Sequence, residues 1–276
     1  MSKCKTIAIC NQKGGVGKTT TTVNLGVGLA MQGKKVLLVD ADPQGDLTTC
    51  LGWQDMDGLP EALPNRLAEI MQDKCTEPLK GILHHKEGVD LIPANSDLFD
   101  YETGLVNAMS REVVLKNYLS EVKKNSNYDY ILIDCTPALN MLTLNSLSAA
   151  DSVIIPVQAH YLSAKCMTQL LKKITQVRKH INPDLQIDGI LLTLVDSRTN
   201  LARSTVDALR QGYGGYIKIY DTQIPFAIKA AEVSSKGKSI YAYEPRSTVS
   251  KAYAAFTKEV LADGRKKERL HSSNVR

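Results

Sequence analysis

Aromatic residues are scarce in this chain, since phenylalanine, tyrosine and tryptophan together make up 5% of its 276 residues. The hydrophobic share is nevertheless 43%, which is typical of a globular protein with a core of valine, isoleucine, leucine and alanine. No apolar run approaches the roughly 20 residues that span a bilayer, and no secretory leader precedes the first apolar run. We therefore expect a soluble, cytoplasmic protein with no membrane partner.

Closely spaced cysteines are absent as well. Cysteines stand at positions 4, 10, 50, 75, 135 and 166 without a Cys-x-x-Cys pair, which favours reduced and mostly buried thiols. His84 and His85 form the only histidine cluster, and neither a carboxylate nor a cysteine stands directly beside them. We expect an exposed pair in a loop there, and no metal site.

The chain does contain a regular alternation of β-prone and helical segments. Short apolar runs occur at residues 6–10, 36–39, 89–92, 130–133, 153–157 and 187–194. Segments with helical spacing of apolar residues lie at 19–32, 104–124, 142–149, 162–180 and 200–211. Near-continuous apolar strands that alternate with helices predict an α/β fold, with a mostly parallel, twisted sheet covered by helices on both faces.

No linker divides this α/β unit, so we predict a single domain over residues 1–262 that ends in an amphipathic helix at 248–262. Residues 52–88 are less regular and predict a variable insertion. Residues 263–276 are strongly basic and nearly free of apolar side chains, which predicts a flexible tail. The alternative for this tail is a weak contribution to nucleic-acid binding.

Residues 13–20 read Lys-Gly-Gly-Val-Gly-Lys-Thr-Thr, directly after an apolar β-prone run and before a helical segment. Glycines in such a loop allow successive backbone N–H groups to surround a phosphate at the N-terminus of a helix. Lys18 is placed to neutralise the β- and γ-phosphate oxygens, and the Thr19 hydroxyl to bind Mg²⁺. The ordinary P-loop pattern has glycine where Gln12 stands, so this loop is a variant with an additional lysine, Lys13.

Carboxylates follow two of the predicted strands. Asp40 and Asp42 come after the run at 36–39, and Asp134 comes after the run at 130–133. Ligands of parallel sheets bind at the carboxyl ends of the strands, so these groups are suited to Mg²⁺ and to orienting an attacking water. A solvent-exposed Asp-Pro turn is the alternative for Asp42. For Cys135 we expect a buried packing residue, with a nucleophile as the alternative.

The sequence closely resembles the ParA/Soj-type partition ATPases of the deviant-Walker (MinD/ParA) superfamily. The resemblance covers nearly the whole chain apart from the basic tail. The variant pattern resembles the partition ATPases of plasmids and integrative mobile elements more than the chromosomal ones. The segments that carry it are residues 11–21, 39–45, 130–135, 156–158, 191–199, 224–225 and 243–247.

By position, the resemblance implies a role for each site residue. Lys13 matches the signature lysine that reaches the phosphates of a partner subunit, Lys18 keeps its ordinary catalytic role, and Asp42 orients the hydrolytic water. Thr19, Asp40 and Asp134 serve the metal. The implied nucleotide-binding residues are Lys13, Gly14, Gly15, Val16, Gly17, Lys18, Thr19, Thr20 and Pro225.

Two basic positions of the family's non-specific DNA surface fall on Arg198 and Lys229. A guanidinium suits phosphate oxygens, although a local salt bridge with Asp196 or Asp207 is the alternative for Arg198. The chain departs from the family at Ala227, where relatives often carry an asparagine near the adenine. It departs again at residues 163–166, on a helix that faces the partner in the family.

The resemblance implies an Mg²⁺-dependent ATP hydrolase that forms a homodimer on binding ATP and then holds double-stranded DNA without sequence preference. Hydrolysis, stimulated by a ParB-type centromere-binding protein, would release the nucleoid-associated dimer from DNA. The alternative is a MinD-like positioning ATPase on membranes, which needs a terminal amphipathic helix with a bulky apolar stripe. The tail offers only Leu270 and Val275 for such a stripe. Electron transfer of the nitrogenase iron-protein kind lacks suitably spaced cysteines.

Overall fold

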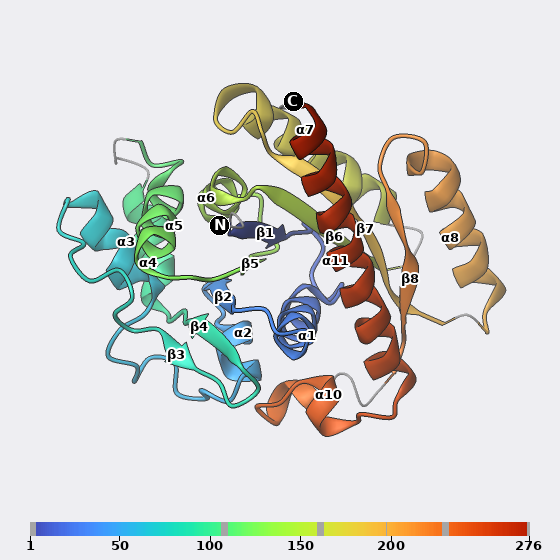
Figure 1. The fold of residues 1–276 in the computed structure, drawn as a ribbon, viewed down its shortest axis with the longest axis horizontal. Helices are drawn as coiled ribbons and strands as arrows, with labels where there is room; N and C mark the ends of the chain where they lie inside the picture. Colours follow the sequence, from blue (N-terminus) through green and yellow to red (C-terminus); the bar gives the residue numbers. More distant parts are fainter. Residues whose placement is uncertain (1–3, 106–109, 159–162, 197, 228–231, 275–276) are drawn as a thin grey trace.

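The computed structural model describes residues 4–105, 110–158, 163–196, 198–227 and 232–274 (Figure 1). Within them, one sheet has the strand order β3-β4-β2-β5-β1-β6-β7-β8. All neighbouring strands are parallel except β3 and β4. The strands are β1 (Lys5–Ile9), β2 (Val36–Ala41), β3 (Leu83–His84), β4 (Val89–Ile92), β5 (Tyr130–Cys135), β6 (Ser152–Gln158), β7 (Gln186–Val195) and β8 (Ile219–Pro225).

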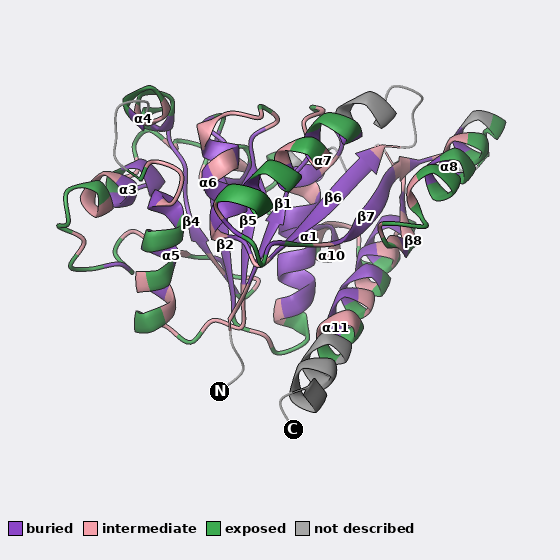
Figure 2. Ribbon diagram, turned by 90° about the horizontal axis from the view of Figure 1, so that it is seen from above, coloured by how far each residue is buried: buried purple, intermediate pink, exposed green. Residues whose placement is uncertain are grey.

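Helices cover both faces of the sheet (Figures 1 and 2). One face packs against α1 (Lys18–Met31), α2 (Asp46–Cys50), α10 (Ile240–Tyr243) and α11 (Thr248–Asn274). The other packs against α3 (Leu63–Met71), α4 (Asp97–Leu105), α5 (Val114–Asn125), α6 (Met141–Ala149), α7 (Ser163–His180) and α8 (Asn200–Tyr213). The predicted fold class is therefore confirmed.

Six of the strands were predicted from apolar runs, whereas β3 and β8 were not. Strand β8 lies at the edge of the sheet, and of its seven residues only Tyr220 and Ile224 are buried, so it lacks the continuous apolar run of a central strand. The predicted helix at 104–124 is wrong in its extent, because α4 ends at Leu105 and α5 begins at Val114. The predicted insertion at 52–88 contains α3 and β3.

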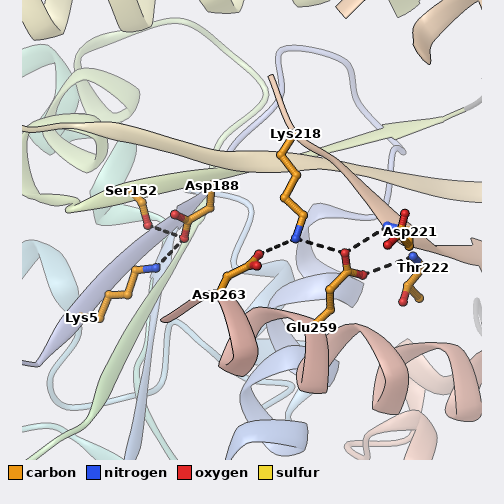
Figure 3. Close-up of polar contacts among 8 residues, drawn as sticks. All are labelled: Lys5, Ser152, Asp188, Lys218, Asp221, Thr222, Glu259 and Asp263. Atoms are coloured by element: carbon orange, nitrogen blue, oxygen red, sulfur yellow. Dashed lines mark hydrogen bonds and ion pairs between the residues drawn. The ribbon is translucent and has the colours of Figure 1, made fainter. Parts of the chain in front are cut away.

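The last helix anchors the edge strand. In α11, Phe256 packs edge-on against Tyr220 of β8, with 4.9 Å between the ring centroids. Glu259 accepts hydrogen bonds from the backbone N–H groups of Asp221 and Thr222 and forms an ion pair with Lys218 (Figure 3). Edge strand β8 is thus held by α11 as well as by β7.

Helix α11 continues to Asn274, well beyond the expected end at residue 262. Most of the segment expected as a flexible tail is therefore helical, while its separation from the ATPase domain stays a prediction. Among the described helices, none combines the length and apolarity that a membrane span requires.

Candidate functional site

The loop between β1 and α1 has the backbone of a phosphate cradle. Gly15 and Gly17 have φ angles of 69° and 82°, in the left-handed region that glycine adopts without strain. A Cβ at Gly14 or Gly15 would meet no atom within 4 Å, so the loop backbone faces open space. Thr193 of β7 donates a 2.8 Å hydrogen bond to the Val16 carbonyl and fixes the loop. The loop therefore presents the N-terminus of a 14-residue helix to an anion.

Thr19 and Asp134 meet at the start of α1. The Thr19 hydroxyl donates a 2.6 Å hydrogen bond to Asp134 Oδ2, and the Thr22 hydroxyl donates a 3.3 Å bond to Asp134 Oδ1. Because Thr19 uses its proton toward Asp134, the lone pairs of its oxygen stay available to a metal ion. Oxygen donors of this kind fit Mg²⁺.

Asp40 lies beside Asp134, because the two residues are direct partners in the register of β2 and β5. Asp40 Oδ2 accepts hydrogen bonds from Thr48 N–H at 2.8 Å and from the Thr48 hydroxyl at 2.7 Å. Asp40 Oδ1 accepts a longer one, 3.3 Å, from the N–H of Asp42. Asp42 is also mostly buried, and its carboxylate accepts a bond from Gln44 N–H. The exposed turn considered for Asp42 is thus not what the structure contains.

Burial raises the pKa of all three carboxyl groups. Burial, reinforced by Asp134, raises the pKa of Asp40 to about 8. Burial likewise raises the pKa of Asp134 to about 7, although the Thr19 hydroxyl and Lys18 act in the opposite direction. Burial also raises the pKa of Asp42. Three buried carboxyl groups face one positive charge, that of Lys18. A divalent cation would stabilise their ionised forms, so these residues fit Mg²⁺.

Lys13 occupies a position that the sequence did not predict. Its backbone N–H is held by the side chain of Asn11, which in turn donates a 2.6 Å bond to the Pro156 carbonyl. The Lys13 ammonium lies 3.3 Å from Oε1 of Gln158, at the end of β6. Asn11 and Gln158 lie in segments that resemble the family, but only the fold shows that they contact Lys13.

The residues expected to contact adenine and DNA follow β7 and β8 at the same edge of the sheet. Pro225 ends β8 and is the register partner of Val195. Arg198 is 85% exposed and forms a two-pronged ion pair with Asp196, in which Nε lies 2.8 Å from Oδ1 and Nη2 lies 2.9 Å from Oδ2. The salt bridge with Asp196 considered for Arg198 is therefore present. Lys229 lies outside the described residues.

The remaining expectations concern cysteines and histidines. Cys135 is fully buried, as expected for a packing residue. The expectation of an exposed pair in a loop is wrong, because His84, although exposed, lies in β3 and His85 is buried against Trp53. A buried ring was not foreseeable, because it depends on the distant backbone of Gly237 that it contacts.

Comparisons with known proteins agree with this geometry. Residues 4–187 match a protein-family model described as an AAA domain. The sporulation initiation inhibitor protein Soj of Bacillus subtilis is 45% identical over 262 residues, which cover 94% of this chain and 99% of Soj. The chromosome partitioning protein ParA of Caulobacter vibrioides is 37% identical over 264 residues, 96% of either chain.

Solved structures share the fold. One described as cobyrinic acid a,c-diamide synthase from Mycobacterium smegmatis, with bound ADP and magnesium, has a TM-score of 0.81 and 35% identity. The match covers 95% of this chain and 96% of that one. The septum site-determining protein MinD of Pyrococcus horikoshii, complexed with Mg-ADP, has a TM-score of 0.71. At 24% identity over 93% of this chain and 96% of that one, MinD shows the fold alone. The full-length relatives settle the family: this chain belongs to the ParA/Soj family of chromosome-partitioning ATPases.

Proposed function

We propose that this protein is a nucleotide-operated switch for DNA partition, in which ATP and Mg²⁺ drive dimerisation and the dimer binds DNA without sequence preference. The observation that carries the proposal is the meeting of the glycine loop, the Thr19–Asp134 pair and the Asp40–Asp42 carboxylates at one edge of the sheet. These groups are the parts that phosphoryl transfer requires.

Each residue has a defined task at this site. The N–H groups of residues 14–19 and the Lys18 ammonium bind the β- and γ-phosphates. The Thr19 hydroxyl, which donates a hydrogen bond to Asp134, would hold the metal ion together with Asp134, and Asp40 would support the site. Asp42 accepts a hydrogen bond from the attacking water and orients it toward the γ-phosphate. Bound Mg²⁺ supplies charge neutralisation of the phosphate oxygens.

Lys13 acts between subunits in this proposal. Its ammonium contacts Gln158 of its own chain. In the dimer, Lys13 leaves Gln158 and binds the phosphates of the partner subunit. The dimer then carries two copies of each basic surface, and DNA binding strengthens because phosphate contacts add. A ParB-type centromere-binding protein stimulates hydrolysis, which dissolves the dimer and releases it from the nucleoid.

Binding to random-sequence duplex DNA tests the proposal. The affinity of wild-type protein for this DNA is measured in the presence of ATP, in the presence of ADP and without nucleotide, over a series of salt concentrations. We expect binding only with ATP, a steep loss with salt, and weaker binding by Arg198→Ala. Arg111→Ala is a matched control, since Arg111 also pairs with a neighbouring acid, Glu112. Binding that ignores the nucleotide, or no binding, contradicts the proposal. Pelleting with anionic liposomes in ATP would then support the MinD-like alternative.

A further inference from the structure

The exposed face of α7 carries positive charge without any acidic residue. From Ser152 to Pro183 the sequence contains neither aspartate nor glutamate, although about a quarter of all residues in a typical chain are charged. Four basic side chains of α7 are described: Lys172, Lys173, Arg178 and Lys179. We call them the α7 basic face. None of them belongs to the nucleotide site.

The packing of α7 directs this face toward solvent. Met167, Leu170, Ile174 and Val177 are fully buried against the sheet. Helical geometry places Lys172 and Lys179, seven residues apart, on the opposite side and about 10 Å from each other along the axis. Lys172, Arg178 and Lys179 are exposed, and Lys173 is partly so. Figure 2 shows α7 as an outer helix with exposed residues along it.

The α7 basic face also lacks counter-ions within the part of the chain that the structure describes. No described side chain forms a salt bridge with any of its four residues. Some basic residues elsewhere on the molecule are paired, as Lys124 is with Glu121 and Arg198 is with Asp196. The guanidinium that the family resemblance assigns to DNA is thus engaged, whereas the α7 basic face is free to bind an anion.

A purely structural explanation covers only half of the face. Arg178 and Lys179 lie in the last turn of α7, where positive charge stabilises the helix dipole. Lys172 and Lys173 lie about two turns earlier, beyond the range of that effect. Helix α7 contains no aspartate or glutamate, so no acidic residue three or four positions away pairs with Lys172 or Lys173.

We infer that the α7 basic face is a binding surface for the phosphate backbone of double-stranded DNA, separate from Arg198. This inference rests on the proposed function. The two basic pairs are about 10 Å apart, whereas successive phosphates of one DNA strand are spaced about 3.4 Å along the helix axis, so the two pairs can reach different phosphates. Flexible lysines bind phosphates as point charges and do not read bases, in keeping with binding that ignores sequence.

The test compares two double variants with the same change in charge. Lys172→Gln/Lys179→Gln removes half of the α7 basic face. Lys251→Gln/Lys258→Gln is the matched control, because both lysines are exposed, lie seven residues apart on α11 and have no described salt bridge. Helix α11 packs on the other face of the sheet. Binding of full-length protein to random duplex DNA with ATP is measured against salt concentration.

For each subunit whose α7 basic face contacts DNA, we expect the slope of log K against log[salt] to become shallower by about 2 in the α7 variant, because each of the two lost phosphate contacts removes about 0.9. The control variant should keep the wild-type slope. Equal slopes in the two variants overturn the inference. It is also overturned if the α7 variant binds DNA as the wild type does but is no longer stimulated by a ParB-type partner. If wild-type protein itself fails to bind DNA with ATP, the proposed function fails first, and the two failures are thereby distinguished.

Discussion

Thr48 offers the sharpest test of how the fold holds the carboxylates. Its hydroxyl is completely buried and has two partners: it donates to Asp40 Oδ2 at 2.7 Å and accepts from the N–H of Ala94 at 3.1 Å. Thr48→Val keeps the shape of the side chain but removes both bonds. The Ala94 N–H is then left without its partner in the core.

The expected loss of stability follows from these two bonds. Burial and Asp134 raise the pKa of Asp40 to about 8, so this group is mostly neutral near pH 7. A hydrogen bond between neutral groups, such as that from the Thr48 hydroxyl, contributes about 1 kcal/mol. The orphaned Ala94 N–H costs a further 1–3 kcal/mol or so. The additional methyl group of valine offsets less than about 1 kcal/mol. We expect Thr48→Val to lower the free energy of unfolding by about 2–3 kcal/mol.

Urea unfolding of wild type and variants at pH 7 measures this difference. Thr49→Val is the matched control, because the hydroxyl of Thr49 lies on the same helix and donates only to the exposed carbonyl of Asp46. We expect the control to lose less than about 1 kcal/mol. Thr48→Ser retains both hydrogen bonds and should lie between the two. Equal stability of the two valine variants refutes the reasoning about the buried hydroxyl.

Three further predictions concern the switch and the edge strand. Lys13→Ala should abolish ATP-dependent dimerisation in analytical ultracentrifugation while Lys34→Ala does not; dimers at wild-type levels argue against an intersubunit lysine. Asp42→Ala should lower ATP turnover at least 100-fold and accumulate ATP-bound dimer, and unchanged turnover removes its role. Glu259→Gln should cost about 1 kcal/mol at pH 7. Burial alone would raise the pKa of Glu259. That pKa is nevertheless held below 4.5 by the N–H groups of Asp221 and Thr222 and by the Lys218 ammonium. The stabilisation by ionised Glu259 is therefore present at pH 7 and lost as pH falls through that lowered pKa. A cost that is the same at pH 7 and pH 4 contradicts this assignment.

Much of the site was predictable from local sequence. The glycine spacing of the loop and its position between a strand and a helix are local properties, and they fix the conformation of residues 13–20. That Asp40, Asp42 and Asp134 come close together also followed from sequence, because parallel strands end at one edge of the sheet. The Arg198–Asp196 pair was considered because two residues so close along the chain meet without any help from the fold.

Other features depend on contacts between distant parts of the chain. The positions of Lys13 and Gln158 are 145 residues apart, and only the pairing of β1 with β6 brings them within 3.3 Å. The support of Asp40 by Thr48, and of Thr48 by Ala94, similarly requires α2 to pack beside the end of β4. Strand β8 was not predicted because this edge strand has few buried residues and is held by contacts with α11.

The sequence by itself thus determined the family, the loop and the types of residue at the site, because these depend on short-range spacing and on the general geometry of parallel sheets. The tertiary structure decided which strands are neighbours, which side chains hold Asp40 and Lys13, and that no described side chain forms a salt bridge with the α7 basic face. The physical reason is that residues from segments far apart in the sequence come into contact only after the chain has folded.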